Sequence, residues 1–332
     1  MNVREKLEKI EVQILSPNAA LSQNSKGRLV PDEQCNLRTV YQVDRDRVIH
    51  SKAFRRLKHK TQVFICPRGD HYRTRLTHTL EVSQIARTIA KSLFLNEDLT
   101  EAIALAHDLG HTPFGHDGEV VLNELSDCGF KHFEQSLRVV DFLEKDGKGL
   151  NLTAEVRDGI LNHTRGDWPE TLEGKAVRWA DRIAYVNHDI DDAIRANVMK
   201  FSDIPSDIID VLGQSKTNRI STLINSIVEN SNDDVLCMSE EVQKSFDKLH
   251  SFMYDFVYTN MESKKEAVKV PAVITGLFDY FISHSDKLPY QMKLIAEKEG
   301  LNRAVCDYIA GMTDYFAINF FENIFIPKSW NI

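Results

Sequence analysis

The chain has 332 residues, 42% of them hydrophobic, and a formal net charge of −8. This length allows one large domain or two modest ones, each with a substantial buried core. The acidic balance excludes a generic nucleic-acid binder, because neutralising a phosphate backbone requires clustered Lys and Arg.

The N-terminus and the cysteines indicate a reducing compartment. The five cysteines are scattered and form no C-x-x-C pair, which argues against a disulfide framework or a thiolate zinc site. The opening MNVREKLEKIEVQ is charged and lacks the apolar segment of a signal peptide. No apolar stretch approaches the length that spans a bilayer. We therefore expect a cytoplasmic protein with no membrane contact.

The first quarter of the chain predicts an arm, a helix and a short irregular segment. Residues 1–44 show a weak helical opening and then a polar loop, which we interpret as an N-terminal arm. Residues 45–58 have helical apolar spacing. Residues 61–76 combine a short β-like run with a Pro-Gly turn, so we expect a brief hairpin or loop there.

The rest of the chain has almost uniformly helical patterns. Residues 77–94 predict an amphipathic helix, and residues 99–109 a mostly apolar, central one that Gly110 ends. Further helices are predicted at 115–126, 130–145, 153–163, 173–199, 220–230, 239–258, 270–284 and 301–321. We expect an all-α fold, with a core over 45–200 and a C-terminal helical region over 201–332 packed on that core.

The histidines are concentrated in one part of the chain. Eight of the twelve fall between His50 and His132, and histidine with carboxylate is a common ligand set for divalent ions. His78, the adjacent His107 and Asp108, and Asp181 lie on three predicted helices, which would place four ligands inside a bundle with positions open for water and substrate. For Asp181 alone, an ion pair with a neighbouring arginine is the alternative.

The run HDLGHTPFGHDGE (107–119) carries the most specific signal. It places three histidines around a Gly/Pro break, and in a packed helical region this density predicts a metal or phosphate site. His116 and Glu119 are three residues apart on one helical face. A carboxylate beside an imidazole can hold its tautomer and raise its pKa, which suits proton transfer near neutral pH. A first-turn Glu favoured by the helix dipole is the alternative for Glu119.

These segments resemble the HD-domain phosphohydrolases, and more narrowly the deoxyguanosine triphosphate triphosphohydrolase family. The matching stretches are FRRLKHKTQVF (54–64), RTRLTHTLEVSQIARTIA (73–90), LAHDLGHTPFGHDGE (105–119), FKHFEQSLRV (130–139), GILNHTRG (159–166), RWADRIAYVNHDIDDA (178–193) and DYIAGMTD (307–314). The resemblance implies an HD-domain fold with additional C-terminal helices. It also implies hydrolysis of a dNTP, dGTP or several dNTPs, to deoxynucleoside and inorganic triphosphate.

The resemblance assigns further roles. It implies that His78, His107, Asp108 and Asp181 bind Mg²⁺ or Mn²⁺, with Fe, Ni and Zn as alternatives. It also implies that His116 and Glu119 form the catalytic pair, with His116 in proton transfer or in-line attack at the α-phosphorus and Glu119 orienting it. His111 would reach a phosphate oxygen or support His116. Substrate contacts are implied for Arg75, Arg182 and His132 at the phosphates, Tyr185 and Asp189 at the deoxyribose, His59 and Gln62 near the sugar and base, and His163 in the pocket lining.

Partners and alternatives remain open. The family implies a homo-oligomer, a tetramer or hexamer, and a regulatory nucleotide. Seven basic residues make the region near residue 50 locally positive: Arg45, Arg47, Lys52, Arg55, Arg56, Lys58 and Lys60. We interpret them as a phosphate-facing or interface helix, with nucleic acid as the less favoured partner. The alternative functions are another HD nucleotide phosphohydrolase or phosphodiesterase, and a non-catalytic nucleotide-sensing module.

Overall fold

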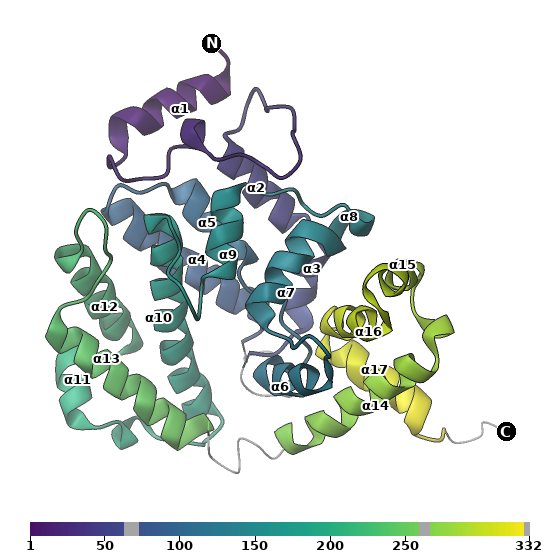
Figure 1. Cartoon of the computed structure of the whole chain (residues 1–332). Helices are drawn as coiled ribbons and strands as arrows, with labels where there is room; N and C mark the ends of the chain where they lie inside the picture. The colour runs from purple at the N-terminus through teal and green to yellow at the C-terminus, as the bar shows by residue number, and fades with distance from the viewer. Residues whose placement is uncertain (63–72, 259–265, 329–332) are drawn as a thin grey trace.

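The computed structural model describes residues 1–62, 73–258 and 266–328, and these residues form an all-α fold (Figure 1). The helices are α1 (Val3–Ile14), α2 (Val40–Ile49), α3 (Lys52–Arg56), α4 (Arg75–Ser92), α5 (Glu97–Ala106), α6 (Gly115–Leu125), α7 (His132–Arg138), α8 (Glu144–Gly147), α9 (Ala154–Leu161), α10 (Leu172–Arg195), α11 (Ser206–Leu212), α12 (Lys216–Asn230), α13 (Glu240–Met253), α14 (Val270–Ser283), α15 (Tyr290–Glu299), α16 (Leu301–Ala310) and α17 (Asp314–Phe325).

Short helical turns complete the secondary structure. The 3₁₀ turns are η1 (Ser22–Asn24), η2 (Leu57–His59), η4 (Phe201–Asp203), η6 (Ala267–Lys269) and η7 (Ser285–Lys287), and the π turns are η3 (Val139–Leu143) and η5 (Tyr254–Tyr258). Two isolated β-bridges join Arg28 to Thr153 and Thr61 to Thr74. No helix within the described ranges has the length and apolar character needed to cross a bilayer.

Helices α4, α5 and α10 pack against one another at the centre of the molecule. In α4 the buried residues Val82, Ile85, Ala86 and Ile89 follow the i, i+3, i+4, i+7 spacing of one helical face. Burying a side chain of this size stabilises the fold by roughly 1.5–3 kcal/mol. Two metal-ligand candidates are therefore carried by the most firmly packed helices, His78 on α4 and Asp181 on α10.

The buried apolar residues form two clusters, which we call the first core and the second core. The first core joins α2, α4, α5, α9 and α10 to α11–α13. The second core is built by α14, α16 and α17 together with α6, which contributes Val121 and Leu122. Figure 1 shows α11–α13 at the left of the molecule and α14–α17 at the right. The packing thus joins residues 206–258 to the first core, although the sequence suggested a boundary near residue 200.

Several predicted helices are interrupted in the structure. The 45–58 helix is divided because the Ser51 side chain accepts a hydrogen bond from the Phe54 N–H and starts α3. The 130–145 helix is divided into α7, η3 and α8, and Thr313 caps α17 and so separates it from α16. Helix α15 was not predicted. Residues 63–72 of the predicted hairpin or loop at 61–76 lie outside the described residues. The Thr61–Thr74 bridge joins the two described ends, and residues 75 and 76 already belong to α4.

Gly110 has a different role from the predicted one. Helix α5 ends at Ala106, four residues earlier, and Gly110 does not adopt a left-handed conformation. A Cβ atom on Gly110 would lie 2.1 Å from the Ser136 backbone nitrogen. The glycine therefore allows α7 to approach the loop that follows Asp108.

Candidate active site

The four predicted metal ligands converge where α4, the end of α5 and α10 meet. His78 Nε2 lies 3.1 Å from Asp181 Oδ1, and His107 Nε2 lies 3.5 Å from Asp108 Oδ1 and 3.8 Å from Asp181 Oδ1. Within the described residues, His78, His107 and Asp108 form one group whose ligand atoms are close enough to share an ion. His107, Asp181 and His163 form a second, overlapping group.

The hydrogen bonding of His107 suits a metal ligand. Its Nδ1 donates to the Ala104 carbonyl oxygen at 2.7 Å, which leaves the lone pair on Nε2. That Nε2 atom is fully buried and has no hydrogen-bond partner, although it faces two carboxylates. A buried nitrogen acceptor without a donor is unfavourable unless a cation occupies the space in front of it. The residues therefore fit a divalent ion.

Both aspartates of the cluster remain ionised. Burial opposes the charge on Asp108, but the Arg75 guanidinium and the hydrogen bond from His111 favour it, and the pKa of Asp108 lies well below its usual range. Burial also opposes the charge on Asp181, yet the hydrogen bond from His78 favours it, and the pKa of Asp181 is lowered to about 2. The site thus presents two anionic oxygen ligands and two imidazoles, a set that suits several divalent ions.

Arg75, the first residue of α4, is buried beside the cluster. Its guanidinium donates to Asp108 Oδ2 at 2.8 Å. Helix α4 begins here because Thr74 and Thr77 form a capping box. The structure therefore brings Arg75 to the site, where it contacts a candidate metal ligand.

Three histidines and one glutamate extend the site beyond the metal ligands. His111 Nε2 donates to Asp108 Oδ1 at 3.1 Å, and its ring stacks on His132 with centroids 4.0 Å apart. Glu119 accepts hydrogen bonds from His116 Nδ1 at 3.1 Å and from His132 Nδ1 at 3.0 Å. The predicted His116–Glu119 pair is therefore formed, and Glu119 also holds His132.

The exposure and protonation of these groups differ. The His116 side chain is 57% exposed, whereas Glu119 is 16% exposed and His111 is buried. Burial alone would raise the pKa of Glu119, but the hydrogen bonds from His116 and His132 lower it far below its usual range. Burial and the Arg75 charge lower the pKa of His111, so that imidazole is neutral at pH 7. The exposed His116 imidazole is thus hydrogen-bonded to Glu119, a carboxylate that is charged at neutral pH.

The turn that leads to His116 is held by the C-terminal region. Phe114 has φ +64°, a left-handed conformation that costs a non-glycine residue of order 1–3 kcal/mol. Its N–H donates to Asp314 Oδ1 at 3.0 Å, and its ring is buried in the second core. The other oxygen of Asp314 accepts from the Thr61 N–H and hydroxyl, at 2.9 and 2.6 Å. One buried carboxylate therefore joins α17 to two segments that border the site.

Lys60 makes a second connection of the same kind. Its buried ammonium donates to the His111 carbonyl oxygen and, at 2.8 Å, to the Ala310 carbonyl oxygen. The interpretation of Lys60 as part of a phosphate-facing or interface helix is wrong for this residue, because its side chain is buried within the fold. Neither Lys60 nor Asp314 was predicted as a site residue. No local pattern identifies them, because each acts on a segment far away in the chain, although Asp314 lies in the family-like DYIAGMTD stretch.

Helix α10 carries the remaining predicted contacts. Asp181, half-buried Tyr185 and buried Asp189 follow one another at intervals of four residues and so share a helical stripe. His188 was not predicted, but its ring lies 5.8 Å from that of His78. Its spacing of seven residues from Asp181, two helical turns, could have indicated this position. The buried His163 lies 4.9 Å from His107, ring to ring, within the cluster.

Three predicted contacts lie outside the cluster or at its edge. The Arg182 guanidinium is directed to α13, 3.3 Å from Asp247 and stacked over the Trp179 and Phe246 rings. His59 is exposed at the end of η2. Gln62 is buried at the edge of the described residues, and its backbone oxygen borders Gly115. The sequence-predicted substrate roles of these residues stay predictions.

Charge pairing reduces the positive character predicted near residue 50. Arg45 contacts Asp46, Asp98 and Glu101 at 3.1–3.4 Å. Arg47 pairs with Asp32 and donates to the carbonyl oxygens of residues 150 and 151. These guanidiniums are therefore neutralised within the fold.

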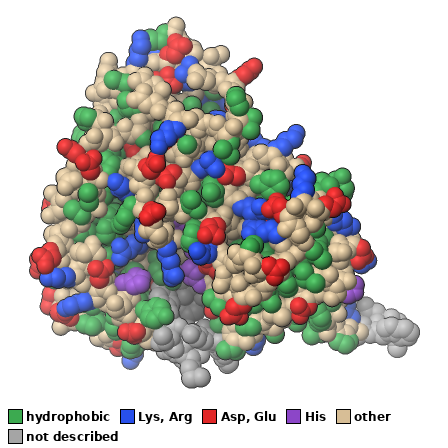
Figure 2. All heavy atoms as spheres, in the orientation of Figure 1, with side chains coloured by type: hydrophobic (Ala, Val, Ile, Leu, Met, Phe, Trp, Pro, Cys, Tyr) green, Lys and Arg blue, Asp and Glu red, His purple; other side chains and the backbone are tan. Residues whose placement is uncertain are grey.

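Histidine side chains are visible low on the face shown in Figure 2, beside the residues that are not described. The chain matches the HD domain family over residues 75–186, which span the ligands from His78 to Asp181, and the phosphohydrolase-associated domain over residues 236–323. It is 56% identical over 331 residues to a deoxyguanosinetriphosphate triphosphohydrolase-like protein of Caldanaerobacter subterraneus, covering 99% of this chain and 98% of that one.

Proteins with the same description are similar in two clostridia. The protein of Clostridium tetani is 49% identical, with 99% of this chain and 97% of that chain covered. That of Clostridium perfringens is 49% identical, with 99% of both chains covered. The chain belongs to the deoxyguanosinetriphosphate triphosphohydrolase-like family of HD-domain proteins. It is therefore a phosphohydrolase, and the histidine–aspartate cluster of this family member could hold a divalent metal ion.

Proposed function

We propose that this family member hydrolyses a deoxynucleoside triphosphate, dGTP or several dNTPs, to deoxynucleoside and inorganic triphosphate with a bound divalent ion. The observation that carries this proposal is the position of His116. Its open imidazole, oriented by Glu119, lies next to His111, with ring centroids 5.4 Å apart, and His111 bonds directly to Asp108. A proton-transfer group and a metal-ligand cluster thus border one site.

The proposed ligands are His78, His107, Asp108 and Asp181. The family resemblance favours Mg²⁺ or Mn²⁺, and a set of two imidazoles and two carboxylates also suits Fe, Ni and Zn. When bound, the ion would polarise a phosphoryl oxygen and lower the pKa of a water molecule. The protein groups then have separate tasks. Arg75 and His132 supply positive or hydrogen-bonding contacts to the phosphates, and His163 lines the pocket.

The proposed reaction breaks the bond between the α-phosphorus and the 5′ oxygen of the deoxyribose. A water oxygen bonds to the phosphorus while His116 takes up one of its protons, and His116 then returns that proton to the departing 5′ oxygen to give the free deoxynucleoside. The triphosphate leaves intact with the water oxygen. Tyr185 and Asp189 occupy the stripe that continues from Asp181 and are proposed to contact the deoxyribose.

Product analysis tests this proposal. The purified protein is incubated with Mn²⁺ and each of the four dNTPs in turn, and the products are separated by chromatography. Deoxynucleoside and triphosphate in equal amounts are expected. Release of pyrophosphate or of single phosphate groups in place of triphosphate would refute it and favour another HD phosphohydrolase reaction. The absence of any product, with each metal and with added second nucleotides, would favour a nucleotide-sensing module.

A further inference from the structure

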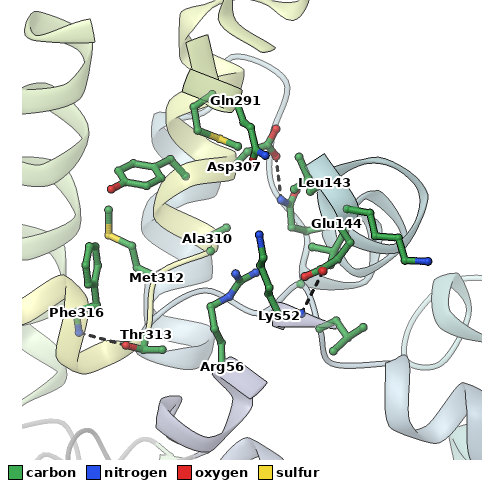
Figure 3. Close-up of a pocket in the computed structure, with 18 of the residues that line it drawn as sticks. Lys52, Arg56, Leu143, Glu144, Gln291, Asp307, Ala310, Met312, Thr313 and Phe316 are labelled. Carbon is green, nitrogen blue, oxygen red and sulfur yellow. Dashed lines mark hydrogen bonds between the residues drawn. The ribbon is translucent and has the colours of Figure 1, made fainter. Parts of the chain in front are cut away.

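A cavity of about 350 Å³ lies between α3, the segment from α7 to α8, and helices α15–α17 (Figure 3). All of its lining residues are described, and none is a member of the histidine–aspartate cluster. Leu109 and Gly110 form part of its wall and follow directly after Asp108 in the chain. The cavity therefore lies behind the loop that carries a candidate metal ligand, separated from the ligand atoms by that loop.

An arginine without a partner is directed into this cavity. Figure 3 shows the Arg56 side chain extending from α3 between Lys52 and Ala310. The Arg56 Nε atom is fully buried and has no hydrogen-bond partner, and the guanidinium forms no ion pair with any described residue. Burial lowers the pKa of Arg56, because its charge is desolvated without full compensation. An anion that accepts hydrogen bonds from this buried guanidinium is expected to stabilise its charged form.

The carboxylates that border the cavity are already engaged. Glu144 accepts hydrogen bonds from the backbone N–H groups of Lys52 and Ala53, at 3.1 and 2.7 Å. Asp307 is bound by Arg138 at 2.7 Å. Asp146 accepts from Gln291 and lies 3.7 Å from the Lys52 ammonium. The Glu144 charge raises the pKa of Arg56 and so offsets part of the desolvation, but the buried Arg56 Nε has no hydrogen-bond acceptor in the fold.

The opposite wall of the cavity is apolar. Met312 and Phe316 face it from the C-terminal region, and Leu143 faces it from the end of η3 (Figure 3). A cavity of this size, with an apolar wall facing a side that carries charged groups, resembles small-molecule sites in general. We propose that it binds a small amphipathic anion, in which one phosphate, sulfonate or carboxylate group meets Arg56 and a flat apolar portion lies against Met312 and Phe316.

Binding of 8-anilinonaphthalene-1-sulfonate, an aromatic sulfonate with this chemistry, tests the proposal by fluorescence titration. The variant Arg56→Met should bind the probe roughly tenfold more weakly, because it loses charge-assisted hydrogen bonds. Arg55→Met is the matched control. Arg55 is the exposed neighbour on the same helix and donates to the His50 carbonyl oxygen, so its loss should leave probe binding unchanged.

A second variant fills the cavity without removing the arginine. A Cβ at Gly311 would make ordinary 3.4 Å contacts and lie 4.0 Å from Arg56 Nη2, so the side chain of Gly311→Leu would project toward the guanidinium. The Gly311→Leu variant should also bind the probe more weakly, because its side chain occupies the cavity. Thermal melting of each variant verifies that it is folded. Probe binding at wild-type strength in both folded variants would overturn the proposal.

Displacement of the probe identifies the chemistry of the anion. Phenyl phosphate and benzoate carry the same flat ring with different anionic groups, and phenol carries the ring without a charge at pH 7. Phenyl phosphate displacing the probe better than benzoate assigns the site to phosphorylated molecules, and the reverse order assigns it to carboxylates. Equal displacement by phenol would show that Arg56 does not recognise charge, and would contradict the proposal.

Discussion

The two sides of the active site rest on different parts of the molecule. The proposed metal ligands project from α4, α10 and the turn that follows α5, and the apolar faces of these three helices build the first core. His116 and Glu119 project from α6, whose buried residues belong to the second core with α14, α16 and α17. The first side is therefore supported by helices within the HD domain match, whereas the second depends on residues that lie 150 or more positions further along the chain.

This difference implies that metal binding and proton transfer can be disturbed separately. Changes in the first core or in the proposed ligands should lower metal binding and, as a consequence, turnover. Changes in the second core or its polar connections should alter the position of His116 and leave the ion in place. The predictions below test this separation and follow in order of decreasing expected effect.

The largest effect is expected from Asp108→Ala. Loss of this anionic ligand should remove the bound ion and lower turnover by a factor on the order of 10³ or more, since the ion contributes several kcal/mol to catalysis. Elemental analysis measures the loss of the ion, and an assay with dGTP measures the loss of turnover. Asp127→Ala, which removes an exposed aspartate beyond α6, is the control and should retain both. Full activity of Asp108→Ala would refute the ligand assignment.

Glu119→Gln should lower turnover by roughly 100-fold, because His116 and His132 lose the carboxylate that orients them. The bound metal should remain at the wild-type level. Since the pKa of Glu119 lies below its ordinary value, its charge stabilises the fold above about pH 4.3, and this stabilisation is lost as pH falls. The free energy of unfolding of the wild type should therefore exceed that of the variant by about 1–3 kcal/mol at pH 5.5.

Chemical denaturation at pH 5.5 and pH 3.5 measures this pH dependence. The stability advantage of the wild type should shrink at the lower pH. An advantage that grows as pH falls from 5.5 to 3.5 would contradict the assigned direction of the pKa shift. Loss of metal in Glu119→Gln would show that the two sides of the site are not separable.

Asp314→Ala removes the carboxylate that joins α17 to Phe114 and Thr61. Three donors lose their acceptor, so we expect a stability loss of about 1–3 kcal/mol. We also expect a roughly 10- to 100-fold fall in turnover, because a small displacement of His116 impairs the reaction geometry. Metal content should stay unchanged. Asp286→Ala, in the exposed η7 turn of the same region, provides the comparison. Wild-type turnover in a folded Asp314→Ala protein would show that the second core does not position His116.

The smallest effect is expected from Arg182→Ala. The guanidinium pairs with exposed Asp247 and stacks on α13, so removing it should cost less than about 1 kcal/mol of stability and change KM for dGTP less than roughly threefold. The control is Lys248→Ala, which removes an exposed cation of α13 itself. A tenfold rise in KM for Arg182→Ala alone would support the substrate contact that the sequence predicted.

The sequence predicted the helical fold correctly and predicted which candidate ligands lie close together, because both depend on local patterns. Apolar residues at helical spacing identified α4 and α10 close to their observed ends. The dense histidine run indicated one site, and His107, Asp108, His111 and Glu119 do lie together. The resemblance to a family supplied roles that spacing alone could not.

The parts that the sequence did not predict depend on long-range contacts. Ser51 divides a helix whose apolar spacing continues across it, since a cap competes locally with propagation. Gly110 is required by the approach of α7, and Lys60 and Asp314 bond to segments 51 to 253 residues away. Hydrogen bonds between distant segments leave no periodic trace in a sequence, so only a structure reveals them.

The attachment of α6 to the second core also determines the order in which the protein can assemble during synthesis. A chain emerges from the ribosome N-terminus first, and its domains fold as they become available. The helices of the first core precede residue 259, so the ligand cluster can form while the last quarter of the chain is still being made. Phe114, Val121 and Leu122 become buried only after α14–α17 have been synthesised and pack on them. With the proposed roles, a nascent or truncated chain would therefore assemble the metal-ligand cluster before it could position His116 for proton transfer, and activity would require α14–α17.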